Sequence, residues 1–176
     1  MLSTKRLLLS KPSNADFSLF SEILSCPQQT KYLPNEMPYS ISQQQDYLRN
    51  RIKHWQEHGF GTFVISLQCL GPKQASKLDV KLGFIGIEYA PSSDLVDIRF
   101  ALIKQHEGLG YTSEAAKAVL EFMSNHTEHR HIYGVTMPEN QASKSVLIKL
   151  GMTPALGVTF YDYDDLDYYS LVLNLN

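Results

Sequence analysis

The 176 residues carry 16 lysines and arginines against 18 aspartates and glutamates, a formal charge of −2, and 43% of them are hydrophobic. This composition excludes the basic field of a nucleic-acid-binding chain and the polar, highly charged pattern of a disordered one. The length suits one hydrophobic core, so we expect a single domain over residues 1–176.

The cysteines and the apolar runs indicate the compartment. Cys26 and Cys69 match neither a zinc-ligand spacing nor a disulfide framework, which favours a reduced, cytoplasmic setting. Apolar runs are only a few residues long, whereas about 18 residues are needed to cross a bilayer. We therefore expect neither a membrane nor a nucleic acid as a partner.

The first half of the chain predicts a strand, two helices and a second strand. Residues 4–10 form the first strand, a helix ends at Pro27, and a second helix runs from a cap at Ser40 or Ser42 to Gly59. The apolar residues of the two helices recur at helical spacing: Phe17, Phe20 and Leu24, then Leu48, Ile52 and Trp55. Residues 62–67 are β-branched and aromatic, which predicts a strand.

The middle of the chain predicts two further strands and a strong helix. The strands cover residues 81–89 and 96–103, and polar connections precede and separate them at 71–77 and 91–94. The period becomes helical from Gly110 to about Asn125. The apolar residues of this helix are Ala115, Ala118, Val119, Phe122 and Met123.

The last third predicts a strand at 131–136, a short helix stopped by Gly151, and a closing hairpin of residues 160–163 and 168–175 around Asp164 and Asp165. The short helix aligns Ala142, Val146 and Leu150. The order β-α-α-β-β-β-α-β-α-β-β predicts a mixed sheet with helices, of the α+β class.

A turn with two glycines connects the strand at 96–103 to the strong helix. Gly108 and Gly110 permit close backbone approach, and the first N–H groups of the helix attract an anion such as a pyrophosphate. The Walker loop is excluded because Tyr111 and Thr112 follow Gly110, and a dinucleotide fingerprint would need a third glycine where Ser113 stands. A plain strand-to-helix turn remains the alternative for two isolated glycines.

The segment Gln105-x-x-Gly108-x-Gly110 resembles the acetyl-CoA pyrophosphate signature of the GNAT N-acetyltransferase superfamily, which is Arg or Gln, x, x, Gly, x, Gly or Ala. Further blocks resemble the branch that includes the ribosomal-protein-alanine and ribosomal-protein-serine N-acetyltransferases, and they keep that branch's order over nearly the whole chain. These blocks are Thr4-Lys5-Arg6-Leu7-Leu8-Leu9, Gly83-Phe84-Ile85-Gly86, Gly108-Leu109-Gly110-Tyr111-Thr112-Ser113-Glu114-Ala115, Pro138-Glu139-Asn140-x-x-Ser143 and Lys149-Leu150-Gly151-Met152.

The resemblance implies a mixed, mostly antiparallel central sheet flanked by helices, in which two splayed parallel strands form the cofactor cleft. It implies that acetyl-CoA donates an acetyl group directly to a primary amine. The residues implied to contact the cofactor are Phe100, Ala101 and Leu102 through their backbone, Gln105, Gly108, Leu109, Gly110, Tyr111 and Thr112 around the phosphates, and Asn140 and Ser143 beside the pantetheine and thioester. Asn140 has helix capping as its alternative role.

The reaction requires a base and an acid, because the amine must lose a proton and the leaving thiolate gains one. Glu88 near the end of its strand is the preferred base or water-orienting residue, and Asp97 on the next strand is a competing candidate. The alternative for Glu88 is a solvated carboxylate at the end of the strand. Ser143 matches, by resemblance, a hydroxyl implicated near the sulfur in serine-specific relatives, or it caps a helix. Tyr161 and Tyr163 are reserve proton donors.

A metal site is not predicted. His126, His129 and His131 straddle a helix end and a strand start, and no cysteine joins them. Four carboxylates on the closing hairpin could attract a cationic amine or simply form a solvated turn. They are Asp162, Asp164, Asp165 and Asp167.

The acceptor implied by the resemblance is the N-terminal α-amine of a protein, such as a ribosomal protein, and the next candidates are a small polyamine, an amino acid or an amino sugar. A homodimer is common in that superfamily. Two alternatives from other classes remain: a noncatalytic acyl-CoA-binding module, and a nucleotide-binding domain of another kind.

Overall fold

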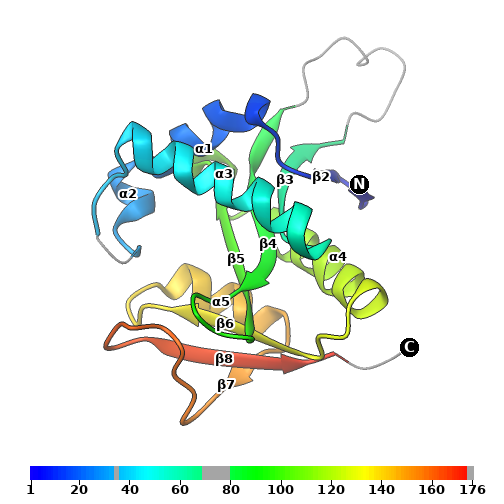
Figure 1. Cartoon of the computed structure of the whole chain (residues 1–176), viewed down its shortest axis with the longest axis vertical. Coiled ribbons are helices and arrows are strands. Elements are labelled where there is room, and N and C mark those ends of the chain that lie inside the picture. The colour runs from blue at the N-terminus through cyan, green and yellow to red at the C-terminus, as the bar shows by residue number, and fades with distance from the viewer. Residues whose placement is uncertain (34–35, 69–79, 174–176) are drawn as a thin grey trace.

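The computed structural model describes residues 1–33, 36–68 and 80–173, and these ranges contain an eight-stranded sheet in the order β1-β2-β3-β4-β5-β6-β8-β7 (Figure 1). All neighbouring strands are antiparallel except β5 and β6, which are parallel. The predicted α+β class with a mixed, mostly antiparallel sheet is confirmed. The strands are β1 Leu2–Ser3, β2 Leu7–Ser10, β3 Thr62–Leu67, β4 Lys81–Tyr89, β5 Val96–Leu102, β6 His131–Thr136, β7 Thr153–Pro154 and β8 Asp167–Val172.

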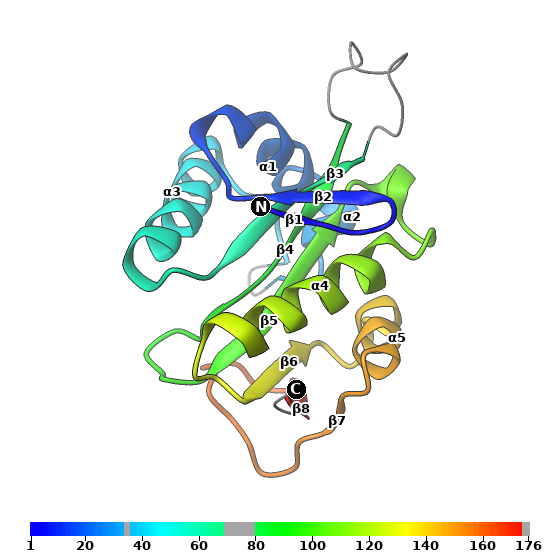
Figure 2. The ribbon, with the colours of Figure 1, turned by 90° about the vertical axis from the view of Figure 1, so that its right-hand side faces the viewer.

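Helices cover both faces of the sheet (Figure 2). Alternation along β4 explains the layers, because Phe84 packs with Phe20 and Leu48 of α1 and α3, whereas Ile85 packs in the larger cluster with Val119 of α4. The helices are α1 Phe17–Leu24, α2 Pro27–Thr30, α3 Ile41–His58, α4 Tyr111–His126 and α5 Gln141–Lys149, and short 3₁₀ turns lie at Asn14–Asp16 and Lys104–His106.

The predicted limits of α3 are confirmed by its caps. The Ser40 hydroxyl accepts the Gln43 N–H at 3.3 Å, and the Gln43 side chain accepts the Ser40 N–H at 2.8 Å. At the other end Gly59 takes a left-handed conformation with φ of 74° and stops the helix.

The two parallel strands diverge. Their register runs from Val96 opposite Ile132 to Ile98 opposite Gly134, and there the pairing ends. Both strands continue without pairing, β5 to Leu102 and β6 to Thr136, so the backbones of their carboxyl ends splay apart in a V, called the V-shaped opening below (Figure 1). The splayed parallel strands that the resemblance implied are therefore present.

The structure corrects two of the predicted elements and adds a short helix after a third. Only Leu7–Ser10 of the predicted strand at residues 4–10 is a strand. The preceding residues form the turn between β1 and β2, in which the Thr4 N–H donates to the Leu7 carbonyl. The first predicted helix is α1, which ends at Leu24 ahead of Pro27 as expected. Pro27 itself begins the short helix α2, where its missing N–H has no intrahelical partner to lose. In α5 the fully buried residue is Leu147, whereas Ala142 is exposed.

The predicted closing hairpin is also wrong. Residues 160–163 lie in the connection between β7 and β8, and β8 pairs with β6 and β7 instead. The aromatic residues that suggested a strand serve tertiary contacts, because the Tyr161 hydroxyl reaches Asp97 on β5. The predicted connection at 71–77, Cys69 and the end of the last predicted strand lie outside the described residues.

Candidate active site

The glycine turn leads directly into α4. Gly108 and Gly110 have φ of 75° and 79°, and Gly110 is the N-cap of the helix. A Cβ atom at Gly108 would meet nothing within 4 Å, so this glycine serves the left-handed conformation rather than close packing. The first intrahelical bond runs from the Glu114 N–H to the Gly110 carbonyl, which leaves the N–H groups of Tyr111, Thr112 and Ser113 directed outward. Such donors suit a phosphate.

The predicted phosphate-contacting residues from Gln105 to Thr112 form one exposed or half-exposed loop before and within the first turn of α4. Gln105 lies in the 3₁₀ turn at Lys104–His106, where its Nε2 is 3.3 Å from the His106 ring. The loop is therefore open to a ligand at the end of the V-shaped opening.

A brace behind this loop was missed by the sequence analysis. Arg6 donates from Nε to Glu114 at 2.7 Å and from Nη1 to the Leu109 carbonyl at 3.0 Å, and its guanidinium lies 4.5 Å from the Tyr111 ring centre. Thr4 donates to the same Glu114 carboxylate at 2.6 Å. Burial alone would raise the pKa of Glu114, but these hydrogen bonds outweigh it and lower the pKa. The loop is thus fixed from behind by the N-terminal strand pair.

The edge of β5 offers backbone groups to a ligand. Along an antiparallel strand the N–H and C=O groups alternate between the two sides. The bond from the Ile103 N–H to the Leu82 carbonyl directs the backbone of Ile103, and with it that of Ala101, toward β4. Phe100 and Leu102 therefore present their N–H and C=O groups to the opening, where they can pair with pantetheine amides.

Gln29 of α2 binds the backbone edge of β5 at its carboxyl end. Its Nε2 donates to the Leu102 carbonyl at 2.8 Å and lies 3.1 Å from Glu107. A ligand along β5 thus shares the Leu102 carbonyl with Gln29. No sequence pattern indicated this contact, because the two residues are 73 positions apart.

The other arm of the opening leads from β6 into α5. Asn140 caps α5, with its Oδ1 accepting the Ser143 N–H at 3.1 Å, so the capping role considered for Asn140 is observed. Ser143 is half-buried in the first turn. Both residues stand where β6 has already diverged from β5.

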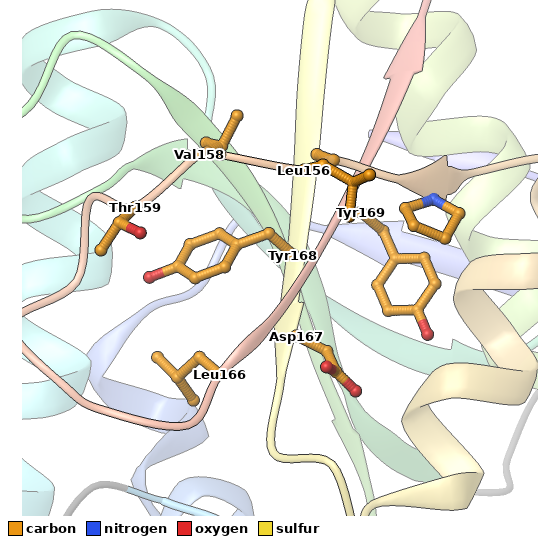
Figure 3. A pocket seen from close by; sticks show the side chains of 10 residues that line it. Leu156, Val158, Thr159, Leu166, Asp167, Tyr168 and Tyr169 are labelled. Carbon is orange, nitrogen blue, oxygen red and sulfur yellow. The ribbon is translucent and has the colours of Figure 1, made fainter.

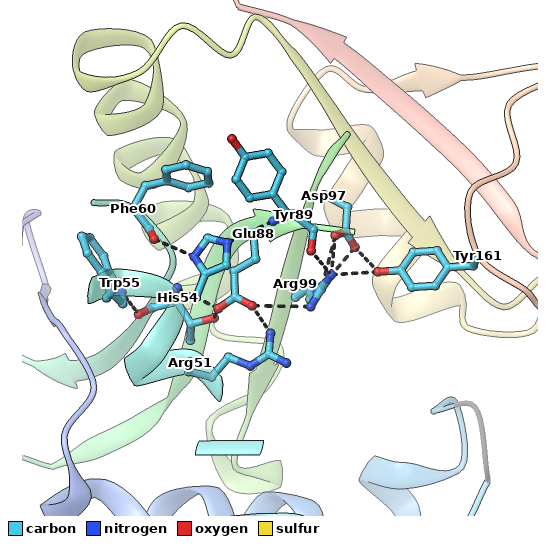
Figure 4. A network of polar contacts seen from close by, with 10 residues as sticks. Arg51, His54, Trp55, Phe60, Glu88, Tyr89, Asp97, Arg99 and Tyr161 are labelled. Atoms are coloured by element: carbon cyan, nitrogen blue, oxygen red, sulfur yellow. Dashed lines mark hydrogen bonds and ion pairs between the residues drawn. The ribbon is translucent and has the colours of Figure 1, made fainter. Parts of the chain in front are cut away.

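Glu88 is buried in a polar network on the face that α1 and α3 cover (Figure 4). Its Oε1 accepts the Thr62 N–H at 3.2 Å and the Thr62 hydroxyl at 2.7 Å. Its Oε2 accepts Arg51 Nη1 and, at 3.5 Å, Arg99 Nη1. Four donors fix this carboxylate, so it can take a proton, directly or through water, only if one of them gives way.

Asp97 lies opposite Glu88 in the register of β4 and β5 and is equally buried. Arg99 binds it through Nε and Nη2 at 2.8–3.2 Å, and the Tyr161 hydroxyl donates to it at 2.9 Å. Burial and Asp97 together raise the pKa of Tyr161, which keeps the phenol protonated. Burial would lower the pKa of Arg99, but Asp97 overcomes this and raises it.

Arg99 is the first residue of β5 beyond the segment paired with β6, so this network stands at the apex of the V-shaped opening. The structure therefore brings Glu88, Asp97 and Tyr161 to one place, as candidates for proton transfer. Neither arginine was singled out from the sequence.

The remaining predicted acidic and aromatic candidates lie in the exposed connection before β8. Tyr163 is 41% exposed, and Asp162, Asp164 and Asp165 are exposed beside it. Asp167 begins β8 and pairs with Lys144 of α5 at 2.5 Å. A cavity of about 310 Å³ lies between this connection and β8, and none of the predicted cofactor-contacting residues lines it (Figure 3).

The three histidines considered as ligands are dispersed. His129 Nε2 lies 3.1 Å from the Tyr89 hydroxyl, and His126 Nδ1 lies 3.0 Å from the Phe122 carbonyl. Within residues 1–33, 36–68 and 80–173, no three His, Cys, Asp or Glu side chains form a group that could hold a metal ion. The helices of the same ranges include none that is long and apolar enough to cross a membrane.

Residues 6–153 match the sequence profile of the acetyltransferase (GNAT) domain family, so the chain belongs to this family of acyltransferases. The family uses acetyl-CoA. An acetyltransferase from Agrobacterium tumefaciens is similar in structure, with a TM-score of 0.84, 22% identity, and coverage of 98% of this chain and 94% of that one.

Two ribosomal-protein acetyltransferases are also similar in fold. The enzyme from Salmonella typhimurium that modifies the N-terminal serine of ribosomal protein L7/L12 has a TM-score of 0.73 and 16% identity, with 97% of each chain covered. A RimL L7/L12 α-N-acetyltransferase bound to coenzyme A has a TM-score of 0.74 and 16% identity, with 98% of this chain and 97% of that chain covered. At these identities the likeness establishes the fold.

Proposed function

We propose that this chain transfers the acetyl group of acetyl-CoA directly to a primary amine, with the N-terminal α-amine of a protein, such as a ribosomal protein, as the leading acceptor. The observation that carries the proposal is the open glycine turn at the start of α4, aligned with the free backbone edge of β5. Acetyl-CoA supplies the activated thioester. The proposed acceptor class follows the relatives that acetylate L7/L12.

The residues of the opening have distinct proposed tasks. The turn from Gln105 to Thr112 binds the pyrophosphate with backbone N–H groups, and Phe100 and Leu102 pair with the pantetheine, with Ala101 between them. Asn140 and Ser143, on the β6 side of the opening, lie beside the pantetheine and the thioester. These contacts hold the carbonyl carbon at the apex, where an amine can attack it.

Proton transfer is assigned to the network at the apex. The C–N bond forms as the C–S bond breaks, the ammonium proton passes to Glu88 directly or through water, and the thiolate takes a proton from Ser143 or Tyr161. Because four donors already hold Glu88, one of them has to move aside before the carboxylate accepts a proton from the amine or from a water molecule.

The cofactor claim is tested by calorimetric titration with acetyl-CoA. Gly110→Leu places a side chain at a left-handed position in front of the helix, where the Cβ alone lies 3.5 Å from Arg6, and should abolish saturable binding. Gly59→Leu is the matched control, since Gly59 is also left-handed with open space around it but ends α3. If the wild-type protein does not bind acetyl-CoA, the proposal is wrong.

Turnover separates an enzyme from an acyl-CoA-binding module. Purified protein, acetyl-CoA and a panel of peptides, amino acids, polyamines and amino sugars are incubated, and the acetylated product is identified by mass spectrometry. Tight cofactor binding without acetylation of any of these amines would favour the binding module. Equal binding of NAD or ATP would instead favour a general nucleotide-binding domain.

A further inference from the structure

Arg51 has one edge of its guanidinium that the protein does not use. Its side chain is 11% exposed, and Nη1 donates to Glu88. Nε is buried and has no hydrogen-bond partner, and among the described residues no acceptor is found for Nη2. The Nε–H bond points to the same side as Nη2, so Glu88 occupies the opposite end of the planar group. A complete two-pronged edge is left over.

Arg99, the other arginine that contacts Glu88, has no such unused edge. Arg99 places its own Nε–Nη2 edge on Asp97 at 2.8–3.2 Å and adds the Tyr89 carbonyl and the Tyr161 hydroxyl. The two arginines are alike in chemistry and share Glu88, but only one is saturated. A buried N–H donor without an acceptor costs about 1–3 kcal/mol, so an unused edge is not favoured by the fold itself.

The unused edge lies close to the apex of the opening. Glu88 bridges Arg51 to Arg99, the first β5 residue beyond the parallel pairing. Tyr47 covers the face of the Arg51 guanidinium, 4.3 Å from its central carbon, and Tyr39 packs on Tyr47 at 6.2 Å between ring centres. Tyr47 therefore covers one face of the guanidinium, and the Nε–Nη2 edge is the part of the group without a protein partner.

We propose that the Nε–Nη2 edge of Arg51 binds a carboxylate of the amine acceptor, and that the enzyme selects amines that carry a carboxylate nearby. Two parallel N–H···O bonds from one guanidinium edge match the geometry of a carboxylate. The Glu88 carboxylate, bound at Nη1 on the other side of the same guanidinium, disfavours the higher charge of a phosphate dianion. The inference rests on the proposed function, because it concerns the acceptor of that same reaction.

The carboxylate has two sources, the α-carboxylate of a free amino acid and an acidic side chain near a peptide N-terminus. The experiment uses one acid–amide pair for each: serine against serinamide, and a C-terminally amidated peptide beginning Ser-Glu against one beginning Ser-Gln. The value of kcat/KM is measured for each at saturating acetyl-CoA. The wild-type enzyme should prefer the acid by about tenfold or more in at least one pair, the usual size of a charge-assisted hydrogen-bonding effect. The pair that shows the preference identifies the source.

The variant Arg51→Lys keeps a positive charge beside Glu88 but removes the two-pronged edge. Its acid-to-amide ratio should fall close to one. Arg49→Lys is the matched control, because Arg49 lies on the exposed side of the same helix and pairs with Asp46, and it should keep the wild-type ratio. Calorimetric titration with acetyl-CoA shows that the Arg51 variant is folded.

A measurement on the wild-type enzyme covers the case in which Arg51→Lys does not fold. The deaminated acid 3-hydroxypropionate should compete with the amine acceptor, whereas its amide should not. A wild-type ratio near one in both pairs, an unchanged ratio in Arg51→Lys, or equal inhibition by acid and amide overturns the inference while leaving the proposed function intact. No acetylation of any acceptor overturns the proposed function itself.

Discussion

Replacing Glu88 by glutamine tests the polar network at the apex of the opening. Glutamine offers one carbonyl oxygen, which can still accept the Thr62 donors, but its NH₂ group then faces the N–H groups of Arg51 and Arg99. Both guanidiniums lose a buried acceptor. Breaking a buried ion pair from one side costs about 3–5 kcal/mol. Since 1 kcal/mol shifts the melting temperature of a domain of this size by roughly 2–4 °C, the variant should melt about 6–20 °C below the wild type.

The assay is differential scanning calorimetry at neutral pH, with Glu57→Gln as control. Glu57 is an exposed carboxylate of α3 paired with Lys53 at 3.6 Å, and such surface pairs contribute little. Its loss should shift melting by no more than about 2 °C. A Glu88→Gln variant that melts within this same margin would refute the argument that four donors hold the carboxylate in a buried site.

The same variant separates a structural from a catalytic carboxylate. If Glu88 takes or relays the amine proton, kcat should fall by about 100-fold or more when measured well below the melting temperature of the variant. A variant that melts early yet keeps its kcat would assign Glu88 to the fold alone and leave Asp97 as the candidate.

Three further predictions concern stability. Gly86→Ala should destabilise the protein by about 1–3 kcal/mol in urea denaturation, because a Cβ atom there would lie 2.2–2.6 Å from backbone atoms of Gly61 and Thr62. An unchanged midpoint would contradict this close approach. Burial lowers the pKa of His54, whose Nε2 accepts the Tyr89 N–H, so the unfolded chain binds the proton more readily than the folded one. The free energy of unfolding should therefore decline as pH falls below 6.5. In the His54→Gln variant this free energy should depend less on pH between pH 5 and 8. Glu114→Gln should lower the free energy of unfolding by about 1 kcal/mol, a value reduced by the solvent exposure of Arg6, and should weaken acetyl-CoA binding in calorimetry. Because the pKa of Glu114 is lowered in the folded protein, the stability difference between wild type and variant should shrink only as pH falls below 4.5. An equal difference at lower pH would contradict an ionic origin.

Patterns local in the sequence determined most of the elements. The strands at 62–67, 81–89 and 131–136 have the predicted bounds, and the capped helix from Ser40 to Gly59 does as well. These elements are set by side-chain alternation, by helical spacing and by capping chemistry, all of which act within a few residues. The predicted closing hairpin is wrong because the Tyr161 hydroxyl donates to Asp97 of β5, a contact with a strand that is distant in the sequence.

In the candidate site, too, local features could be predicted from the sequence, whereas contacts between distant residues could not. The glycine turn could be found from the sequence because a left-handed N-cap needs glycine at a fixed spacing before a helix, and the resemblance placed acetyl-CoA there. The Arg6–Glu114 brace joins residues 108 positions apart, and Arg51 meets Glu88 across 37 positions. Such pairings depend on which faces of strands and helices the fold brings together, so no local pattern encodes them.

The sequence by itself therefore determined the class of the fold, the position of the glycine turn proposed to bind phosphate, and the carboxylates worth testing. Only the tertiary structure decided that Glu88 is held by four donors, that Phe100 and Leu102 face the opening while the backbone of Ala101 does not, and that Arg51 keeps an unused edge. The physical reason is that hydrogen-bond saturation belongs to a three-dimensional neighbourhood, whereas glycine conformation and apolar periodicity belong to the chain itself.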